Sequence, residues 1–255
     1  MLQEELPKDK APAKTGADGG TLPDNAVACF DHIDMWVFDL DNTLYPASSN
    51  LFAAIDARMK SFIAQALAIP PEEAWHIQKR YFEEYGTTLR GLMLHHDTDP
   101  RAFLDHVHDI DISPVAPAPR LHAALEALKG RKIVYTNGSN AHARRIMERL
   151  GIYELFHGVF DIVDAGYIPK PQKESYERLT AHFDLKPEKT VFFEDLTRNL
   201  APAAAIGMTT VWVRNNSPWA EEAKNHEEPH IHHITDDLVG WIEALVEGQK
   251  PAKTA

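Results

Sequence analysis

The segment DMWVFDLDNTLYP, residues 34–46, runs from apolar residues into two aspartates, Asp39 and Asp41. The apolar run WVFDL at 36–40 is typical of a strand that is buried on both faces of a parallel sheet. Two carboxylates directly after such a strand repel each other and lose hydration, and residues 34–46 contain no Lys or Arg to pair with them. A functional role is therefore favoured, with a solvated turn or helix start as the alternative for this motif alone.

Four further apolar runs are predicted to be buried strands: KIVYT at 132–136, VFDIV at 159–163, TVFFE at 190–194 and TTVWV at 209–213. Helical patterns lie between them, one over 120–130 and one over 139–151 with Ser139 or Asn140 as its N-cap and Gly151 at its end. This alternation predicts an α/β fold, a doubly wound (Rossmann-like) parallel sheet that binds ligands at the carboxyl ends of its strands.

The interval between the first two strands is too long for one strand–helix–strand unit. Thr136 lies 97 positions after Asp39, whereas such a unit needs roughly 30 residues. Apolar residues over 51–67 follow the period of an amphipathic helix, and a second helix is expected to begin near Pro71. The favoured interpretation is a helical cap domain over 47–115, inserted after the first strand; the alternative is a helical excursion that only covers the sheet.

The rest of the chain then divides into a core and two tails. Residues 31–46 and 116–247 are predicted to form the Rossmann-like catalytic core, and SPVAPAP at 113–119 is expected to be the linker that returns to it. Residues 1–30 show no sustained apolar period and are expected to be a disordered tail, and residues 248–255 a C-terminal tail.

The charge balance restricts the possible partners. The chain carries 26 basic and 38 acidic residues, a formal net charge of -12, which disfavours attraction to nucleic acid or to an anionic membrane. The single cysteine, Cys29, cannot form an internal disulfide, and the sequence shows neither a signal-peptide pattern nor an apolar run of roughly 18 residues. We therefore expect a soluble protein of the reducing cytoplasm.

Polar groups of different chemistry follow the later strands. YTNGS places Thr136, Asn137 and Gly138 after the second run, where a hydroxyl and backbone amides would suit an anion. Lys170 lies between two prolines in GYIPKPQKESY, ahead of a helix that is expected to begin near Lys173. Each segment alone is also compatible with an ordinary turn or a solvated charge.

An adjacent acidic pair, Glu194 and Asp195, ends the fourth run in FFEDLTRNL, ahead of a helix that Thr197 or Asn199 is expected to cap. Because the carboxyl ends of parallel strands meet at one edge of a sheet, this pair is expected to lie beside Asp39. Carboxylate oxygens from Asp39, Asp195 and Glu194 would suit Mg²⁺, which would also offset the repulsion between an aspartate nucleophile and a phosphate.

Together these motifs resemble the haloacid dehalogenase superfamily over roughly residues 34–246. Within it, the segments DLDNTLYP, KIVYTNGS, YGTTLRGLM and FFEDLTRNLAPA resemble the pyrimidine 5'-nucleotidase branch. The resemblance implies a phosphatase in which Asp39 attacks phosphorus and forms an aspartyl phosphate. It also implies that Asp41 is the general acid and base, with its backbone carbonyl on Mg²⁺.

The resemblance assigns roles to the remaining motif residues as well. It implies that Thr136 and the Asn137 amide bind the phosphoryl oxygens and that Lys170 offsets charge between the nucleophile and the phosphate. The implied metal ligands are Asp39, Asp41, Asp195 and Glu194. Glu194 stands where many relatives carry an aspartate, so its contact with the metal is either direct or through a water.

The substrate that this resemblance implies is a small phosphorylated metabolite, in particular a nucleoside monophosphate such as UMP or CMP. The alternatives are a phosphatase of a sugar phosphate, phosphoglycolate or a vitamin phosphate, a 2-haloacid dehalogenase, a phosphomutase, and a catalytically silent binding protein. Six aromatic residues of the cap segment would either stack on a planar base or form the core of the cap; they are Phe52, Phe62, Trp75, Tyr81, Phe82 and Tyr85.

The histidine-rich stretch NHEEPHIHHITDDL, residues 225–238, is a weaker candidate for a metal site. It has no cysteines, and its histidines are not placed at i, i+4 on a clear helix. We expect a surface loop there, followed by a short strand-like piece and a final helix over 236–248.

Overall fold

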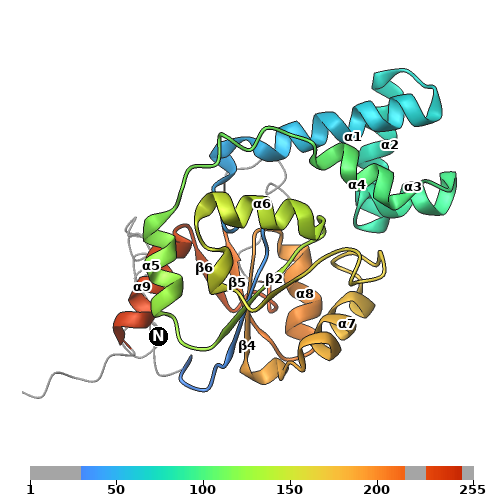
Figure 1. Ribbon diagram of the computed structural model, residues 1–255. Coiled ribbons are helices and arrows are strands. Elements are labelled where there is room, and N and C mark those ends of the chain that lie inside the picture. The colour runs from blue at the N-terminus through green and yellow to red at the C-terminus, as the bar shows by residue number, and fades with distance from the viewer. Residues whose placement is uncertain (1–29, 216–227, 249–255) are drawn as a thin grey trace, which may run out of the picture.

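The computed structural model describes residues 30–215 and 228–248, and its core is a six-stranded sheet in which neighbouring strands are parallel. The strand order is β3-β2-β1-β4-β5-β6, which places β1 between β2 and β4 in the interior of the sheet (Figure 1). The strands are β1 (Met35–Phe38), β2 (Arg131–Tyr135), β3 (Gly158–Phe160), β4 (Thr190–Glu194), β5 (Thr209–Val213) and β6 (His233–Thr235).

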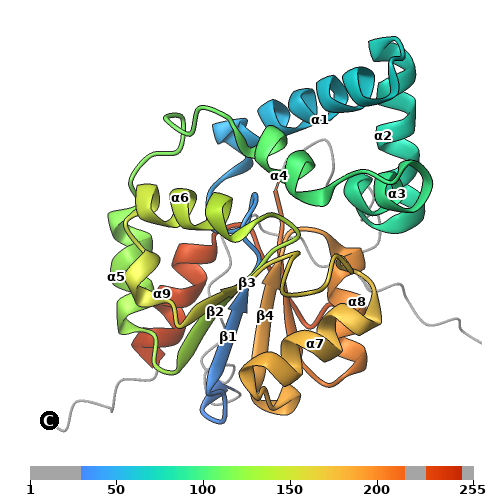
Figure 2. The same ribbon diagram turned by 45° about the vertical axis from the view of Figure 1, so that its right-hand side comes forward.

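Helices cover both faces of the sheet. They are α5 (Pro119–Ala127), α6 (Asn140–Leu150), α7 (Lys173–Phe183), α8 (Thr197–Ala205) and α9 (Leu238–Gly248). Trp36 and Phe38 of β1 pack in one apolar layer with α5, α6 and α9, and the alternate residues Met35 and Val37 pack in the other layer with α7 and α8 (Figure 2). The predicted α/β, doubly wound parallel sheet is therefore confirmed.

The third strand is shorter than the sequence pattern predicts, because β3 ends at Phe160 rather than at residue 163. Asp161 Oδ1 accepts hydrogen bonds from the backbone amides of Val163 and Asp164 at 2.8 and 2.9 Å. These bonds turn the chain directly after β3.

Helix α8 is not capped by Thr197 or Asn199, so that prediction was wrong. Its N-cap position is Leu196, whose side chain forms no cap hydrogen bond. The Leu196 amide instead donates to Glu194 Oε1 at 3.1 Å. Helix α6, in contrast, has the predicted Ser139 cap, which accepts from the His142 amide at 3.3 Å.

Between β1 and α5 the chain forms a helical insertion, which comprises α1 (Leu51–Leu67), α2 (Pro71–Tyr85), α3 (Thr88–His96) and α4 (Pro100–His108). Its helices pack around a hydrophobic cluster that is separate from the two layers of the sheet. Figures 1 and 2 show the insertion beyond the carboxyl ends of the strands. The helices begin at 51 and 71 as expected, and the domain limits 47–115 stay a prediction.

The helical insertion approaches the core closely at Gly86, directly after α2. Gly86 has φ of +85°, and a Cβ at this position would lie only 2.9 Å from the Lys170 carbonyl oxygen. A second contact lies at the other end of the insertion, where Arg145 of α6 donates to the His108 carbonyl oxygen at 2.9 Å. The insertion is therefore held against the core at two points.

The predicted tails lie almost wholly outside the described residues. Phe30, the last residue of the predicted N-terminal tail, is buried, and its ring lies 6.3 Å from that of Trp36 and 5.3 Å from that of Trp241. Gly248, the first residue of the predicted C-terminal tail, is the last residue of α9. The described residues therefore include one residue of each predicted tail.

The described part of the histidine-rich stretch begins at residue 228, so His226 lies outside it. His232 Nδ1 accepts from the Thr210 amide at 3.0 Å, and His233 packs against Phe30.

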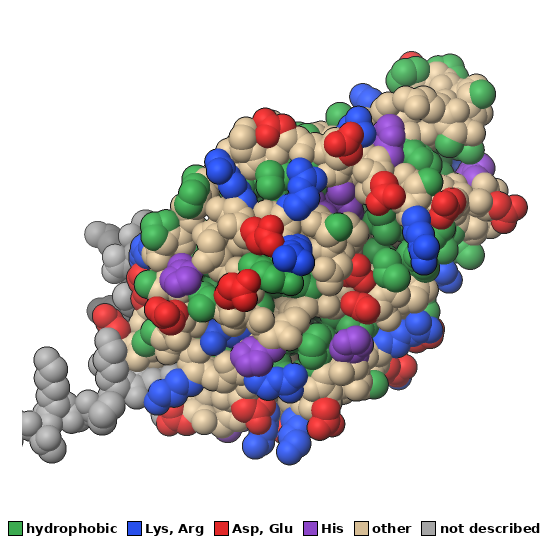
Figure 3. Space-filling model, in the orientation of Figure 1, with side chains coloured by type: hydrophobic (Ala, Val, Ile, Leu, Met, Phe, Trp, Pro, Cys, Tyr) green, Lys and Arg blue, Asp and Glu red, His purple; other side chains and the backbone are tan. Residues whose placement is uncertain are grey.

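Within 30–215 and 228–248, no helix combines the length and the apolar character that crossing a membrane requires. On the face shown in Figure 3, acidic and basic side chains are interspersed.

Candidate active site

The polar residues predicted at the strand ends all line one cavity, which the helical insertion also lines. They come from separate parts of the chain that the sheet brings to one edge. In chain order they are Asp39 and Asp41 after β1, Thr136 and Asn137 after β2, Lys170 before α7, and Glu194 and Asp195 at the end of β4.

Lys170 lies at the centre of this arrangement and has only 1% of its surface exposed. Its Nζ donates to Asp39 Oδ1 and to Glu194 Oε2, both at 2.6 Å, and to the Tyr135 carbonyl oxygen at 3.0 Å. Burial alone would lower the pKa of Lys170, but the two carboxylates raise it above its ordinary value. The side chain therefore stays charged, and its three donors are all used.

The residues after β2 bind the backbone of Lys170 and offer a hydroxyl group to the cavity. Asn137 Oδ1 accepts from the Lys170 amide at 2.9 Å, and Asn137 Nδ2 donates to the Lys170 carbonyl oxygen at 3.2 Å. The Asn137 side chain thus positions the lysine, a role that the sequence did not indicate. Thr136 Oγ1 accepts from the Gly138 amide at 2.9 Å, which leaves its hydroxyl hydrogen available to an anion.

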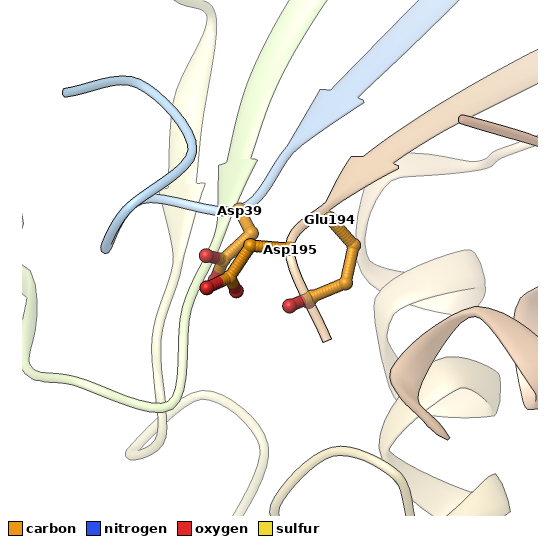
Figure 4. A group of neighbouring side chains, drawn as sticks. All are labelled: Asp39, Glu194 and Asp195. Atoms are coloured by element: carbon orange, nitrogen blue, oxygen red, sulfur yellow. The ribbon is translucent and has the colours of Figure 1, made fainter. Parts of the chain in front are cut away.

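Three carboxylates converge beside Lys170. Asp39, Glu194 and Asp195 each offer an oxygen, and these oxygens all lie within 4.8 Å of one another (Figure 4). Burial, followed by the charge of Glu194, raises the pKa of Asp39 to about 8, and the same two causes raise the pKa of Asp195 well above its ordinary value. The carboxylates outnumber the one ammonium group paired with them, and hard oxygen donors suit a divalent cation. The residues therefore fit such an ion.

Glu194 is less available to a cation than the two aspartates. Its Oε2 accepts from Lys170 and its Oε1 accepts from the Leu196 amide. Asp195 Oδ2, in comparison, accepts one hydrogen bond, from Asn215 at 3.1 Å. This difference favours Asp39 and Asp195 as direct ligands and a water between Glu194 and the cation.

Asp41 lies in the same cavity but outside the Lys170 network. Its Oδ1 accepts from the Tyr45 hydroxyl at 2.5 Å and lies 3.3 Å from His142 Nε2. Burial would raise the pKa of Asp41, but the hydrogen bond from His142, together with the bond from Tyr45, lowers it. The pKa values of Asp39 and Asp41 thus shift in opposite directions, because the two carboxylates lie in different surroundings.

Comparison with known proteins now identifies the family. The family model for haloacid dehalogenase-like hydrolases matches residues 33–207, from just before β1 to just after α8. The chain is a haloacid dehalogenase-like hydrolase. The matched range contains every predicted site residue.

Two curated proteins illustrate how this haloacid dehalogenase-like hydrolase relates to others. It is 26% identical to phosphate metabolism protein 8 of Saccharomyces cerevisiae over 191 residues. The aligned region covers 68% of this chain but only 59% of the yeast protein. It is 29% identical to glyceraldehyde 3-phosphate phosphatase of Methanocaldococcus jannaschii over 191 residues. The aligned region covers 69% of this chain and 82% of that relative.

Solved structures show the same fold. A phosphatase of the family from Thermococcus onnurineus aligns with a TM-score of 0.54 at 16% identity and covers 84% of this chain and 97% of that structure. The L-2-haloacid dehalogenase of Xanthobacter autotrophicus aligns with a TM-score of 0.52 at 17% identity and covers 86% of this chain and all of that structure. At these identities the likeness concerns the fold alone.

The residues that the helical insertion contributes to the cavity carry mostly apolar side chains. Of the six aromatic residues predicted to face a base or to form the core of the cap, Phe52 and Phe82 line the cavity. The Arg198 guanidinium lies 3.9 Å from the centre of the Phe82 ring. The other four aromatic residues are not among the residues that line the cavity; they are Phe62, Trp75, Tyr81 and Tyr85.

Gln78 in α2 is a polar residue among these apolar side chains and is 2% exposed. Its Nε2 donates to Asp56 Oδ1 at 2.8 Å, and Asp56 also pairs with Lys79 at 2.6 Å. Because a carboxylate only accepts hydrogen bonds, the amide must present its nitrogen to Asp56. Gln78 Oε1 is then a buried acceptor that has no hydrogen-bond partner in the described part of the chain.

Sequence reasoning missed three polar residues of this region: Tyr45, Gln78 and His142. His142 follows the Ser139 cap of α6 by three positions, so the first turn of a helix beginning at the TNGS motif was the signal that could have identified it. Tyr45 follows Asp41 by four positions within the segment 34–46. Gln78 lies within a helix of the insertion and had no comparable signal.

Proposed function

We propose that this protein is a Mg²⁺-dependent phosphomonoester hydrolase that works through an aspartyl phosphate. The observation that carries the proposal is the division between Asp39, bound to Lys170 within the acidic group, and Asp41, which has its own donors. A nucleophile and a proton carrier need different surroundings. The M. jannaschii relative is named a phosphatase, which supports the same chemistry.

In the first step an Asp39 carboxylate oxygen forms a bond to phosphorus while the bond between phosphorus and the ester oxygen breaks. Asp41 donates its proton to the departing oxygen, so the alcohol leaves as a neutral molecule. Lys170 offsets the negative charge of nucleophile and phosphate, and the Thr136 hydroxyl donates to a phosphoryl oxygen.

In the second step a water molecule forms a bond to the phosphorus of the aspartyl phosphate while the bond to Asp39 breaks. The Asp41 carboxylate accepts a proton from this water. The products are inorganic phosphate and the original carboxylate of Asp39, so both aspartates return to their starting states.

The proposed metal ligands are Asp39, Asp195 and the backbone carbonyl of Asp41, with Glu194 in contact through a water. When bound, Mg²⁺ supplies the positive charge that allows a phosphate dianion to approach the Asp39 carboxylate. The described carboxylate cluster supports this assignment through its hard oxygen donors and the raised pKa values of Asp39 and Asp195.

The proposed substrate is a pyrimidine nucleoside monophosphate such as UMP or CMP. Phe52 and Phe82 offer apolar surface to a planar ring, and Gln78 Oε1 offers an acceptor to the N–H of uracil or the amino group of cytosine. A small sugar phosphate is the second candidate, because a curated relative is named for glyceraldehyde 3-phosphate. A 2-haloacid dehalogenase would have no use for the acid Asp41, and a phosphomutase would share the core motifs.

The test is phosphate release from UMP, CMP, AMP, ribose 5-phosphate and glyceraldehyde 3-phosphate, and halide release from a 2-chloro acid, each with Mg²⁺ and with a chelator. We expect Mg²⁺-dependent phosphate release, with kcat/KM for UMP and CMP at least about tenfold above the other esters. Turnover that persists in chelator, or halide release, would contradict the phosphatase. If kcat/KM for glyceraldehyde 3-phosphate exceeded that for UMP and CMP tenfold, the substrate would be a small sugar phosphate and not a nucleotide.

Gln78→Met removes the acceptor and keeps the length of the side chain. We expect kcat/KM for UMP to fall about tenfold, the value of roughly one hydrogen bond, with kcat/KM for ribose 5-phosphate unchanged because that ester has no base. Steady-state kinetics on the two substrates measure this difference. Equal losses on both would show that Gln78 supports the insertion and does not contact a base.

A further inference from the structure

Asp41 presents its two carboxylate oxygens to different surroundings. Oδ1 accepts from the Tyr45 hydroxyl at 2.5 Å and faces His142 Nε2 at 3.3 Å. No hydrogen bond to Oδ2 is found in the described part of the chain. Because the carboxylate only accepts, His142 Nε2 must carry a hydrogen, and both neighbours of Oδ1 are donors.

His142 has no other polar function that would explain its burial. It is 1% exposed, and its Nδ1 lacks a hydrogen-bond partner among the residues that the structure describes. Its ring stacks on that of His108 at 4.3 Å and 12°. A buried side chain with an unpaired nitrogen costs free energy relative to an apolar ring of similar shape, so a contact with the catalytic acid is the feature that distinguishes histidine here.

The second side chain that donates to Asp41 Oδ1, Tyr45, is also buried. Tyr45 is 1% exposed, and its hydroxyl lies 2.5 Å from Oδ1. Because the carboxylate only accepts, the hydroxyl of Tyr45 donates its hydrogen to Oδ1. With two donors on Oδ1, a proton carried by Asp41 belongs on Oδ2.

We propose that His142 is a positioning residue, which together with Tyr45 holds Oδ1 of Asp41 and makes Oδ2 the atom that exchanges the proton in both steps. The proposal rests on the proposed phosphatase function. In the first step Oδ2 gives its proton to the leaving oxygen, and in the second Oδ2 takes a proton from the attacking water. His142 itself neither gains nor loses a proton in this scheme.

The test compares two esters whose leaving groups differ in their need for a proton. UMP releases an alkoxide unless it is protonated, whereas p-nitrophenyl phosphate releases a phenolate that is stable as an anion. The ratio kcat/KM reports only the steps up to the departure of the leaving group, so it isolates the donation of the proton from the later attack of water.

We expect His142→Phe, which keeps a planar ring against His108, to lower kcat/KM for UMP by roughly 10²-fold and that for p-nitrophenyl phosphate by less than about fivefold. His142→Gln places an amide N–H near the position of Nε2 and is expected to recover most of the UMP activity. Tyr45→Phe removes the other donor with little change of shape and is expected to show the same dependence on the ester. Asp41→Asn gives the pattern for complete loss of the acid.

Equal losses on the two esters for both His142→Phe and Tyr45→Phe would overturn the proposal, because a structural role affects both reactions alike. A His142→Gln variant no better than His142→Phe would overturn it too. Should His142→Phe fail to fold, the Tyr45→Phe and His142→Gln measurements decide. A wild-type protein that releases phosphate from neither ester would instead refute the proposed function itself, so the two failures are distinguishable.

Discussion

Asp39→Asn is expected to abolish turnover, with a loss of about 10⁴-fold or more, because the variant lacks the nucleophile that forms the covalent intermediate. An amide is a poor nucleophile and a weak ligand for a hard cation. The structure places Asp39 Oδ1 2.6 Å from Lys170 Nζ and beside two further carboxylates. Phosphate release from UMP and trapping of the phosphorylated protein with hydroxylamine measure the loss.

The matched control is Asp105→Asn, the same chemical change at an exposed position of α4. It is expected to keep wild-type turnover, and circular dichroism should show that both variants are folded. If Asp39→Asn retained more than about a tenth of the activity, or still formed a hydroxylamine-sensitive intermediate, Asp39 would not be the nucleophile.

Lys170→Met is expected to reduce both activity and stability. Lys170 is the ammonium group that binds Asp39 and Glu194 in a buried site, and removing one partner of a buried ionic group costs roughly 3–5 kcal/mol. Turnover should also fall strongly, because the lysine that offsets charge between nucleophile and phosphate is gone.

The stability loss of Lys170→Met should depend on pH. The folded protein raises the pKa of Asp39 to about 8, above that of an unfolded aspartate, so the folded state binds more protons between about pH 4 and pH 8. Stability from this group therefore falls as pH rises through that window. Loss of the lysine raises the pKa further, so the variant continues to lose stability above pH 8, where this loss levels off in the wild type. We expect a larger loss at pH 9.5 than at pH 5.5 in metal-free buffer.

Urea unfolding of wild type and variant at the two pH values measures this difference. Lys173→Met is the matched control, because Lys173 pairs with Glu177 on the surface and its side chain is 77% exposed. Its unfolding midpoint should match that of the wild type at both pH values. An equal destabilisation of Lys170→Met at pH 5.5 and pH 9.5 would show that the buried carboxylates do not repel one another as described.

The sequence predicts the sheet and the polar residues at its edge well, because both depend on short-range patterns. Apolar runs of five residues locate β4 and β5 to the residue, and polar groups at the ends of parallel strands must meet at one edge. The length of the interval after β1 indicates an insertion without any knowledge of its packing. Features of this kind do not require a side-chain conformation.

The contacts that adjust the site are less predictable, because they join residues through space. The His142 contact with Asp41 spans 101 positions, and the choice of Phe52 and Phe82 over four other aromatic residues depends on the rotation of each helix in the insertion. The missed cap of α8 has a different, local origin, because the N-cap position is Leu196, whose apolar side chain cannot accept a hydrogen bond.

The position of β1 in the interior of the sheet has a consequence for how the protein folds. Asp39 is synthesised early, but its partner Lys170 follows 131 positions later, and β1 pairs with β2 and β4 from distant parts of the chain. Contacts of such long sequence separation require large loops to close before they stabilise anything, so folding is expected to be slow. A nascent chain that ends before β4 contains Asp39 without the acidic pair, so the proposed site is complete only after β4 has docked.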